Sequence, residues 1–203
     1  IRAAGRTWAG CSGNPPAGHR HGATRRCDHA TAGPARVADA WSLRLRRSDI
    51  MPNASVRKVL KTPRIKKIRR LQYAALCYRL NGGKVQILMI TSHSGHRWTI
   101  PKGWPMSGRK PEETAAREAW EEAGVKGKAT DNCIGGFAYR KRSNPQPHFA
   151  LVFPVKVRKL EKRFPERGER KRRWVSRRKA ASMVKEKELA KLLERFDPAA
   201  LGR

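Results

Sequence analysis

One stretch, residues 103–125, constrains the fold and the chemistry of this chain more than any other. In it an arginine is followed one, four and five residues later by glutamates: Arg117 precedes Glu118, Glu121 and Glu122. Pro111 favours the first turn of a helix, Gly124 favours a helix end, and the residues between them are rich in alanine. The stretch therefore predicts a helix from about Pro111 to Ala123, preceded by a loop rich in glycine and proline.

At helical spacing the three glutamates lie on one face of this helix. Like charges at such spacing oppose one another by about 0.2–0.5 kcal/mol per pair on an exposed helix. Three carboxylates together need either open solvent or a cation, and local conflicts of this kind tend to mark function. The spacing alone leaves two interpretations open, a solvated acidic face and a divalent-metal site.

The whole stretch resembles the Nudix box, the signature of the Nudix hydrolases. The resemblance rests on the Gly103 loop, on Arg117-Glu118, on the apolar Ala119 and Val125, and on Glu121-Glu122-x-Gly124. This pattern fixes many positions across 23 residues, so it is far more specific than an isolated E-x-x-E-E.

The resemblance implies an α/β (α+β) Nudix fold, in which a mixed β-sheet is sandwiched between helices, and it extends over roughly Tyr73 to Phe196. Runs at His96–Gly103, Glu121–Gly127 and Arg170–Trp174 are similar to the diphosphoinositol polyphosphate phosphohydrolase branch and its bacterial relatives. The implied activity is metal-dependent hydrolysis of a phosphoanhydride bond in a nucleoside diphosphate-X, a dinucleoside polyphosphate or an inositol pyrophosphate.

The same resemblance implies roles for the three glutamates. Glu118 and Glu122 would bind metal, and Glu121 would be a further ligand or the base, so that the catalytic residues are Glu121 and Glu118. Carboxylates favour hard divalent ions, which makes Mg²⁺, or Mn²⁺, the expected cofactor. For the substrate, the family runs and the affinity of basic side chains for phosphate indicate five positions: Lys102, Gly103, Arg140, Lys141 and Arg170.

One position departs from the family pattern. The box has a glutamate six residues after its first glycine, where this chain has Arg109. In the family that glutamate partners the arginine that precedes the metal-binding glutamates, so Arg117 must find another acid here. Glu113, one turn earlier, and Glu121, one turn later, are both within reach on a helix. A catalytically inactive relative is the alternative that this substitution leaves open.

Residues 1–50 differ in composition from the rest: they hold nine arginines but no lysine and no glutamate, with many Gly, Ala and Pro residues in no period. We expect no fold there and interpret the segment as disordered or as a non-native upstream extension of a domain that spans residues 51–203, because Met51 stands just before the composition changes. A targeting segment is the other interpretation, since transit peptides are rich in arginine and poor in acids.

Positive charge dominates the domain as well. Nine arginines and three aspartates give residues 1–50 a charge of +6, so +25 of the formal net charge of +31 belongs to the remainder. Such a surface attracts polyanions. The expected partner is a polyphosphorylated small-molecule substrate, and the alternative is a basic nucleic-acid-binding protein that uses a Nudix fold with little or no catalysis.

The four cysteines show no C-x-x-C pairing, and no run of about 18 apolar residues occurs. We therefore expect a reduced, cytoplasmic protein with no membrane partner. Outside the helix, apolar patterns predict strands over 72–80, 84–91, 98–100, around 133–138, 148–157 and 170–175, and a closing helical region over 177–196 with Ser176 as its N-cap. Gly135-Gly136 predicts a bulge, residues 140–142 a basic loop, and Pro154 an edge or a bend in its strand.

Overall fold

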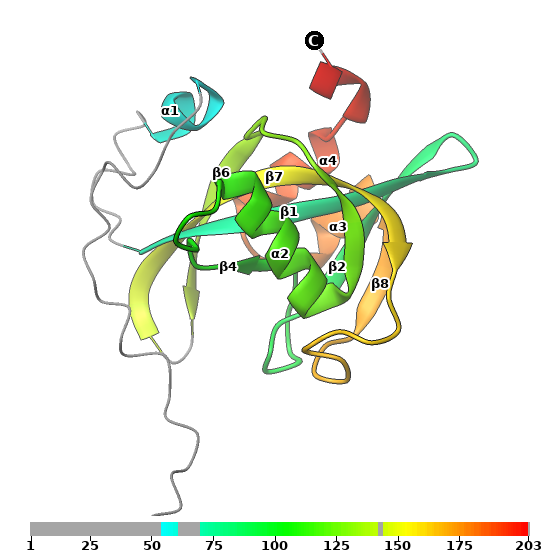
Figure 1. Cartoon of the computed structure of the whole chain (residues 1–203), viewed down its shortest axis with the longest axis horizontal. Coiled ribbons are helices and arrows are strands. Elements are labelled where there is room, and N and C mark those ends of the chain that lie inside the picture. The colour runs from blue at the N-terminus through cyan, green and yellow to red at the C-terminus, as the bar shows by residue number, and fades with distance from the viewer. Residues whose placement is uncertain (1–53, 61–69, 142–143, 203) are drawn as a thin grey trace, which may run out of the picture. The chain divides into compact units, whose positions relative to one another are not determined.

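A mixed sheet of eight strands forms the centre of the protein (Figure 1). The computed structural model describes residues 54–60, 70–141 and 144–202, and all of them lie within one compact unit, residues 44–203. In chain order the strands are β1 (Arg70–Asn81), β2 (Lys84–Thr91), β3 (Trp98–Thr99), β4 (Lys102–Gly103), β5 (Val125–Ala129), β6 (Gly135–Lys141), β7 (Asn144–Leu160) and β8 (Arg172–Ser176). The interpretation of residues 1–50 concerns a segment outside the described residues, and the domain boundary at Met51 stays a prediction.

β1 and β7 lie side by side in the middle of this sheet. They run parallel, with Tyr73 opposite Leu151, whereas every other pairing among the described strands is antiparallel. β2 forms a hairpin with β1, over the two strands predicted at 72–80 and 84–91, and pairs in turn with β3 and β8. β5 and β6 pair with β7, and the short β4 pairs with β1, with Gly103 opposite Tyr73. One parallel pairing among antiparallel ones makes the sheet mixed, as predicted.

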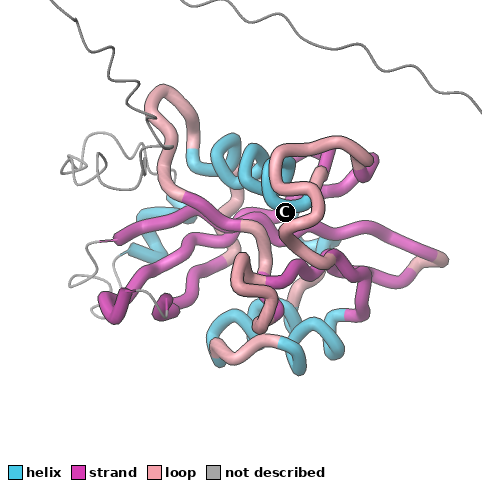
Figure 2. Tube along the Cα trace, turned by 90° about the horizontal axis from the view of Figure 1, so that it is seen from below, coloured by secondary structure: helices cyan, strands magenta, loops and turns pink. Residues whose placement is uncertain are grey.

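Helices cover both faces of the sheet, as Figure 2 shows. They are α1 (Ala54–Leu60), α2 (Pro111–Ala123), α3 (Arg177–Met183) and α4 (Lys187–Arg195), followed by a short 3-10 turn at Pro198–Gly202. Side chains alternate along β1: Ala75 and Cys77 pack into one core with α2, and Ala74 and Leu76 pack into a second core with α3 and α4. The predicted α+β fold, a mixed sheet sandwiched between helices, is confirmed.

Local sequence determines both ends of α2. Pro111 occupies the first turn, and the Glu113 carboxylate accepts a hydrogen bond from the Lys110 N–H (3.1 Å). Gly124 takes a left-handed conformation (φ 63°), which favours glycine, and its N–H donates to the Trp120 carbonyl (2.8 Å). Three buried alanines at four-residue spacing let the helix lie close to the sheet: Ala115, Ala119 and Ala123. The helix predicted over these residues is confirmed.

Of the two expectations for Pro154, an edge strand or a bend, the edge strand is wrong, because β7 is a central strand. Pro154 lies opposite Leu76 in the ladder with β1. On the other side of β7, pairing with β6 ends at Val152 and pairing with β5 begins at Val155. Pro154 therefore lies in the gap between these two neighbouring strands. A missing N–H costs little at such a gap. The Pro154 carbonyl still accepts a hydrogen bond from the Thr130 N–H (3.0 Å).

Other boundaries differ from the sequence expectations as well. Gly135-Gly136 pairs regularly with β7, and the register shift lies between Tyr139 and Lys141. Residues 140 and 141 belong to β6 instead of a basic loop, Cys133 precedes that strand, and β5 is an additional strand that its charged sequence did not indicate. The closing region is two helices separated at residues 184–186. Ser176 caps the first of them, because its Oγ accepts from the Lys179 N–H (3.3 Å).

Two of the four cysteines lie in the part of the chain that the structure describes. Cys77 and Cys133 are buried free thiols, and burial raises the pKa of both. A thiol with a raised pKa is a poor nucleophile at neutral pH, so we assign neither of them to chemistry. In the same set of residues, no helix is long and apolar enough to cross a membrane.

Candidate active site

The glutamate face of α2 lies against the short strand and loop that precede it in the chain. The Lys102 backbone N–H donates a hydrogen bond to Glu122 Oε2 (3.0 Å). The backbone at Gly103 comes so close to the Glu118 carboxylate that a Cβ there would overlap it, so a larger residue would displace that carboxylate. β4 fixes this approach because it pairs with β1. The fold therefore brings the Gly103 loop together with two of the predicted glutamates.

Arg170 lies in the same cluster and neutralises part of its charge. Its Nη2 is 2.6 Å from Glu122 Oε1, and its Nε is 2.5 Å from Glu166 Oε2. A third hydrogen bond joins Nη1 to the Thr91 carbonyl (3.2 Å). The side chains of Arg170 and Glu122 are only 8% and 7% exposed, so this ion pair is buried. As placed, Arg170 orients Glu122, and a direct contact between Arg170 and a phosphate stays a prediction.

Burial and mutual repulsion raise the pKa of the Glu118 carboxyl to about 8. Burial contributes most, followed by the charges of Glu122, Glu121 and Glu166. Burial also raises the pKa of Glu122, although neighbouring cations oppose that rise. Without a metal ion, Glu118 therefore carries a proton at neutral pH. A divalent ion would take the place of that proton, so the carboxylate oxygens here fit a hard cation such as Mg²⁺ or Mn²⁺.

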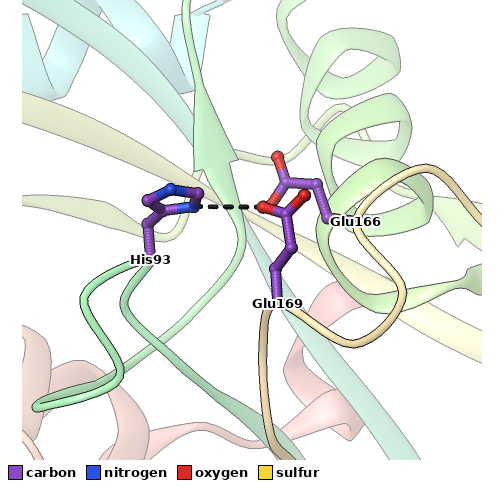
Figure 3. A group of neighbouring side chains, drawn as sticks. All are labelled: His93, Glu166 and Glu169. Carbon is purple, nitrogen blue, oxygen red and sulfur yellow. Dashed lines mark ion pairs between the residues drawn. The ribbon is translucent and has the colours of Figure 1, made fainter.

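A second group of ligand-type side chains lies close to Arg170 (Figure 3). His93 comes from the loop between β2 and β3, and Glu166 and Glu169 come from the loop between β7 and β8; their ligand atoms all lie within 4.8 Å of one another. Among the described residues no other three His, Cys, Asp or Glu side chains converge so closely, and the α2 glutamates do not. The side chains of His93 and Glu169 are 77% and 46% exposed, and Glu166 already pairs with Arg170, so we assign no ion to this group.

The predicted basic residues occupy different surroundings. Burial lowers the pKa of the Lys102 ammonium, and the nearby Glu122 carboxylate opposes that shift. The pKa of Lys141 is lowered by burial in the same way, again with Glu122 opposing, so both lysines lie within the electrostatic reach of the cluster. Arg140 is exposed and lies at the register shift between Tyr139 and Lys141. Phosphate binding by these residues stays a prediction.

Comparison with known proteins agrees with this geometry. A family model described as the Nudix domain matches residues 70–196, which is well over half of the chain. The chain belongs to the Nudix domain family. Nudix hydrolase 12, mitochondrial, of Arabidopsis thaliana is 32% identical over 119 residues, which cover 56% of this chain and 59% of that protein. Diphosphoinositol polyphosphate phosphohydrolase 3-alpha of Mus musculus is 32% identical over 103 residues, which cover 50% and 60% of the two proteins.

This Nudix domain thus spans about three fifths of the length of those two relatives. A solved structure, the binary complex of a C. elegans Ap4A hydrolase, is similar with a TM-score of 0.52 and 22% identity, covering 66% of this chain and 99% of that one. At this identity the likeness supports the Nudix fold and nothing finer. Because one of the relatives carries a mitochondrial name, the cytoplasmic location expected for this chain stays a prediction.

The departure at Arg109 in this Nudix box is compensated within α2. Arg117 Nε lies 2.5 Å from Glu121 Oε1, one turn later, and the Arg117 guanidinium stacks 4.4 Å from the centre of the Trp120 ring. Glu113, the other acid within reach, accepts a hydrogen bond from the helix N-terminus instead. Of the two partners that the sequence left open for Arg117, the structure therefore selects Glu121.

An aromatic row beside the Nudix box was missed by the sequence reasoning. Trp104, at the start of the box loop, lies next to His148 of β7, and His148 lies next to Tyr139 of β6, with ring centroids 5.7 and 5.2 Å apart. The one signal in the sequence was a tryptophan placed directly after Gly103 in a loop that is otherwise mostly polar or small. The other two rings come from strands far along the chain, so no local pattern indicates the row.

Proposed function

We propose that this Nudix domain hydrolyses a phosphoanhydride bond in a nucleoside diphosphate-X, a dinucleoside polyphosphate or an inositol pyrophosphate, with Mg²⁺ or Mn²⁺ as cofactor. The observation that carries the proposal is the Glu118 carboxyl, whose pKa of about 8 reflects buried carboxylates gathered against the Gly103 loop. A cluster of this kind is unfavourable until a cation joins it, which points to function more than to stability. Relatives named as hydrolases support the same class of reaction.

Hydrolysis of a phosphoanhydride needs neutralised phosphate charge and a water held in line with the leaving oxygen. A divalent ion, when bound, neutralises phosphate charge and lowers the pKa of water. In this chain Glu118 and Glu122 would hold the ion, with Glu121 as a further ligand. Arg170 Nη2 and the Lys102 N–H each hold one oxygen of Glu122, which keeps that carboxylate oriented for the role.

The attacking water must lose a proton, and we assign its acceptor to the acids on α2. The raised pKa of Glu118 belongs to the metal-free site, and an ion bound to its carboxylate would lower that pKa, so the role of Glu118 in proton transfer rests on its place beside Glu121 and Glu122. Glu121 lies one turn later and is held by Arg117 at 2.5 Å. We therefore assign the acceptor to the pair of acids, Glu118 and Glu121, and not to one of them alone.

Phosphate groups that point away from the metal would meet the lysines of β4 and β6. Lys102 and Lys141 lie within the electrostatic reach of Glu122, and the net charge of +25 over residues 51–203 would draw polyanionic substrates toward them. The positive charge suggested an alternative, nucleic-acid binding without catalysis. That function would not explain why the Glu122 carboxylate is buried beside Glu118. We therefore take hydrolysis as the function.

Initial rates on a panel of nucleoside diphosphate-X compounds, dinucleoside polyphosphates and inositol pyrophosphates, with Mg²⁺, test the proposal. Glu122→Gln should lower kcat by more than about 100-fold, because even residues that only orient metal ligands cost about 10–100-fold. Glu194, exposed on α4, provides a charge-matched control, and Glu194→Gln should keep the parent rate. A parent that hydrolyses no member of the panel, or a Glu122→Gln variant within a few-fold of the parent, refutes the proposal.

A further inference from the structure

Trp104 is an exposed aromatic ring at the edge of the candidate active site. Among the described residues only two large hydrophobic side chains are exposed, Trp104 at 38% and Leu80 at 55%. Leu80 lies at the end of β1, beside the hairpin turn, and single exposed apolar residues of that kind are common. Trp104 is different because of its position: it directly follows Gly103, whose backbone lies against the Glu118 carboxylate.

The Trp104 ring lies against the buried His148, which in turn lies against the buried Tyr139. His148 is 1% exposed, Tyr139 is 7% exposed, and the Tyr139 hydroxyl hydrogen-bonds to the Gln72 side chain. Burial lowers the pKa of His148, so its imidazole is neutral and offers an uncharged surface to Trp104. A ring held in this way is already ordered, so a ligand that stacks on it would lose little of its binding free energy to side-chain ordering.

Cations lie along the same row. Lys141 Nζ is 5.8 Å from the centre of the Trp104 ring, and Lys102 Nζ is 5.5 Å from the centre of the Tyr139 ring. The Lys141 contact is near the outer limit for a cation–π interaction, so a ligand can displace it at small cost. The site therefore presents, in order, an aromatic surface, ammonium groups and carboxylates. A nucleotide presents the matching groups in the same order: a base, phosphates and their metal ion.

We propose that Trp104 stacks on the heteroaromatic base of the substrate, and that the substrate is therefore a nucleoside or dinucleoside polyphosphate and not an inositol pyrophosphate. The inference rests on the proposed function for the phosphate and metal parts of the site. An inositol pyrophosphate has no aromatic face, and charged phosphate groups surround its ring, so it gains less from an indole than a base does. Because every base has a π-face, stacking alone does not select among the bases.

Calorimetric titration of the full chain with Mg²⁺ tests this inference. The ligands are α,β-methylene adenosine triphosphate, which has a base, and tripolyphosphate, which has none. Base stacking on an aromatic side chain changes affinity by about 5- to 150-fold. Trp104→Ala and Trp104→Leu should both weaken nucleotide binding by a factor in that range and leave tripolyphosphate binding within about two-fold of the parent. Trp104→Phe should keep most of the nucleotide affinity, because it keeps a ring.

Leu80→Ala is the matched control, since it removes the other exposed large apolar side chain, and it should change neither affinity. Circular dichroism melts confirm that each variant is folded, and Trp104→Leu preserves apolar bulk if the alanine variant is unstable. An equal loss for both ligands would mean that the ring only shapes the loop, and an unchanged nucleotide affinity would mean that it contacts no base. Either result overturns the inference.

The two proposals fail in different ways in this experiment. Binding of a methylene analogue requires no hydrolysis, so a parent that binds it through Trp104 but cleaves nothing would refute the proposed function alone. A parent that cleaves phosphoanhydrides but whose nucleotide affinity does not depend on Trp104 would refute only the base-stacking inference.

Discussion

Replacing Arg170 with methionine tests how the glutamate cluster is held together. The pair with Glu122 is buried on both sides, at 8% and 7% exposure, and removing one partner of a buried ion pair costs about 3–5 kcal/mol. The pair with Glu166, whose side chain is 30% exposed, adds at most about 1 kcal/mol. We therefore expect Arg170→Met to lose about 3–5 kcal/mol of unfolding free energy. For a domain of this size the corresponding fall in Tm is about 6–20 °C.

The assay is urea unfolding in EDTA at pH 8, with Arg173→Met as the control because Arg173 is an exposed arginine on the neighbouring β8 strand. The cause of the loss would be an unpaired buried carboxylate at Glu122. Adding Glu122→Gln to Arg170→Met should therefore recover stability, since an amide needs no counter-charge. The loss should also be smaller at pH 5, because burial raises the pKa of Glu122 and a proton can then neutralise it.

Two results would refute this reasoning. A loss below about 1 kcal/mol would mean that the ion pair behaves like an exposed one. A double variant no more stable than Arg170→Met would mean that the single variant fails through lost packing, with no contribution from the unpaired charge of Glu122.

Two further predictions concern the residues that face each other across the loop and the helix. The pKa of the Glu118 carboxyl is about 8 in the folded protein and about 4.5 in the unfolded chain. The stability that this group contributes is therefore complete below about pH 4.5 and is lost as pH rises through 8. In EDTA the parent Tm should fall from about pH 6 to about pH 9, and Glu118→Gln should flatten that fall. Gly103→Ala would overlap the Glu118 carboxylate, which can turn aside, so we expect stability to change by less than about 1 kcal/mol while kcat falls severely, measured against the exposed Ser107→Ala in the same loop. A Gly103→Ala variant with the parent kcat would contradict the close approach.

The sequence could predict the part of the site whose residues all lie on one helix. Pro111 and Gly124 determine the ends of α2 through backbone conformation, which is local, and the spacing of the glutamates follows from the helical repeat. The partner of Arg117 could be narrowed to two acids for the same reason. Local spacing could not show which of the two acids pairs with Arg117. The structure shows that Glu113 instead accepts a hydrogen bond from the Lys110 N–H at the helix N-terminus.

The rest of the site depends on contacts between distant segments. Glu122 and Arg170 are 48 residues apart, and the aromatic row joins the box loop to β6 and β7. The edge alternative for β7 failed for the same reason. Pro154 indicates an edge or a bend when only its own strand is considered, and it is tolerated because the pairings of β7 with β6 and with β5 end and begin on either side of it. Local chemistry indicates which residues are unusual, and only the sheet topology shows what they touch.

The excess of positive charge in the chain makes the electrostatics of the site informative. Residues 51–203 carry a net charge of +25, yet the carboxyl of Glu118 has a pKa of about 8, so burial and the neighbouring carboxylates outweigh the effect of nearby cations such as Lys102. The two nearby arginines form ion pairs with other acids: Arg117 with Glu121, and Arg170 with both Glu122 and Glu166. A further buried ammonium beside Glu118 would itself be costly, as the lowered pKa of Lys102 shows. Under the proposed function, a small divalent ion would supply the positive charge that Glu118 lacks, because carboxylates readily bind such ions.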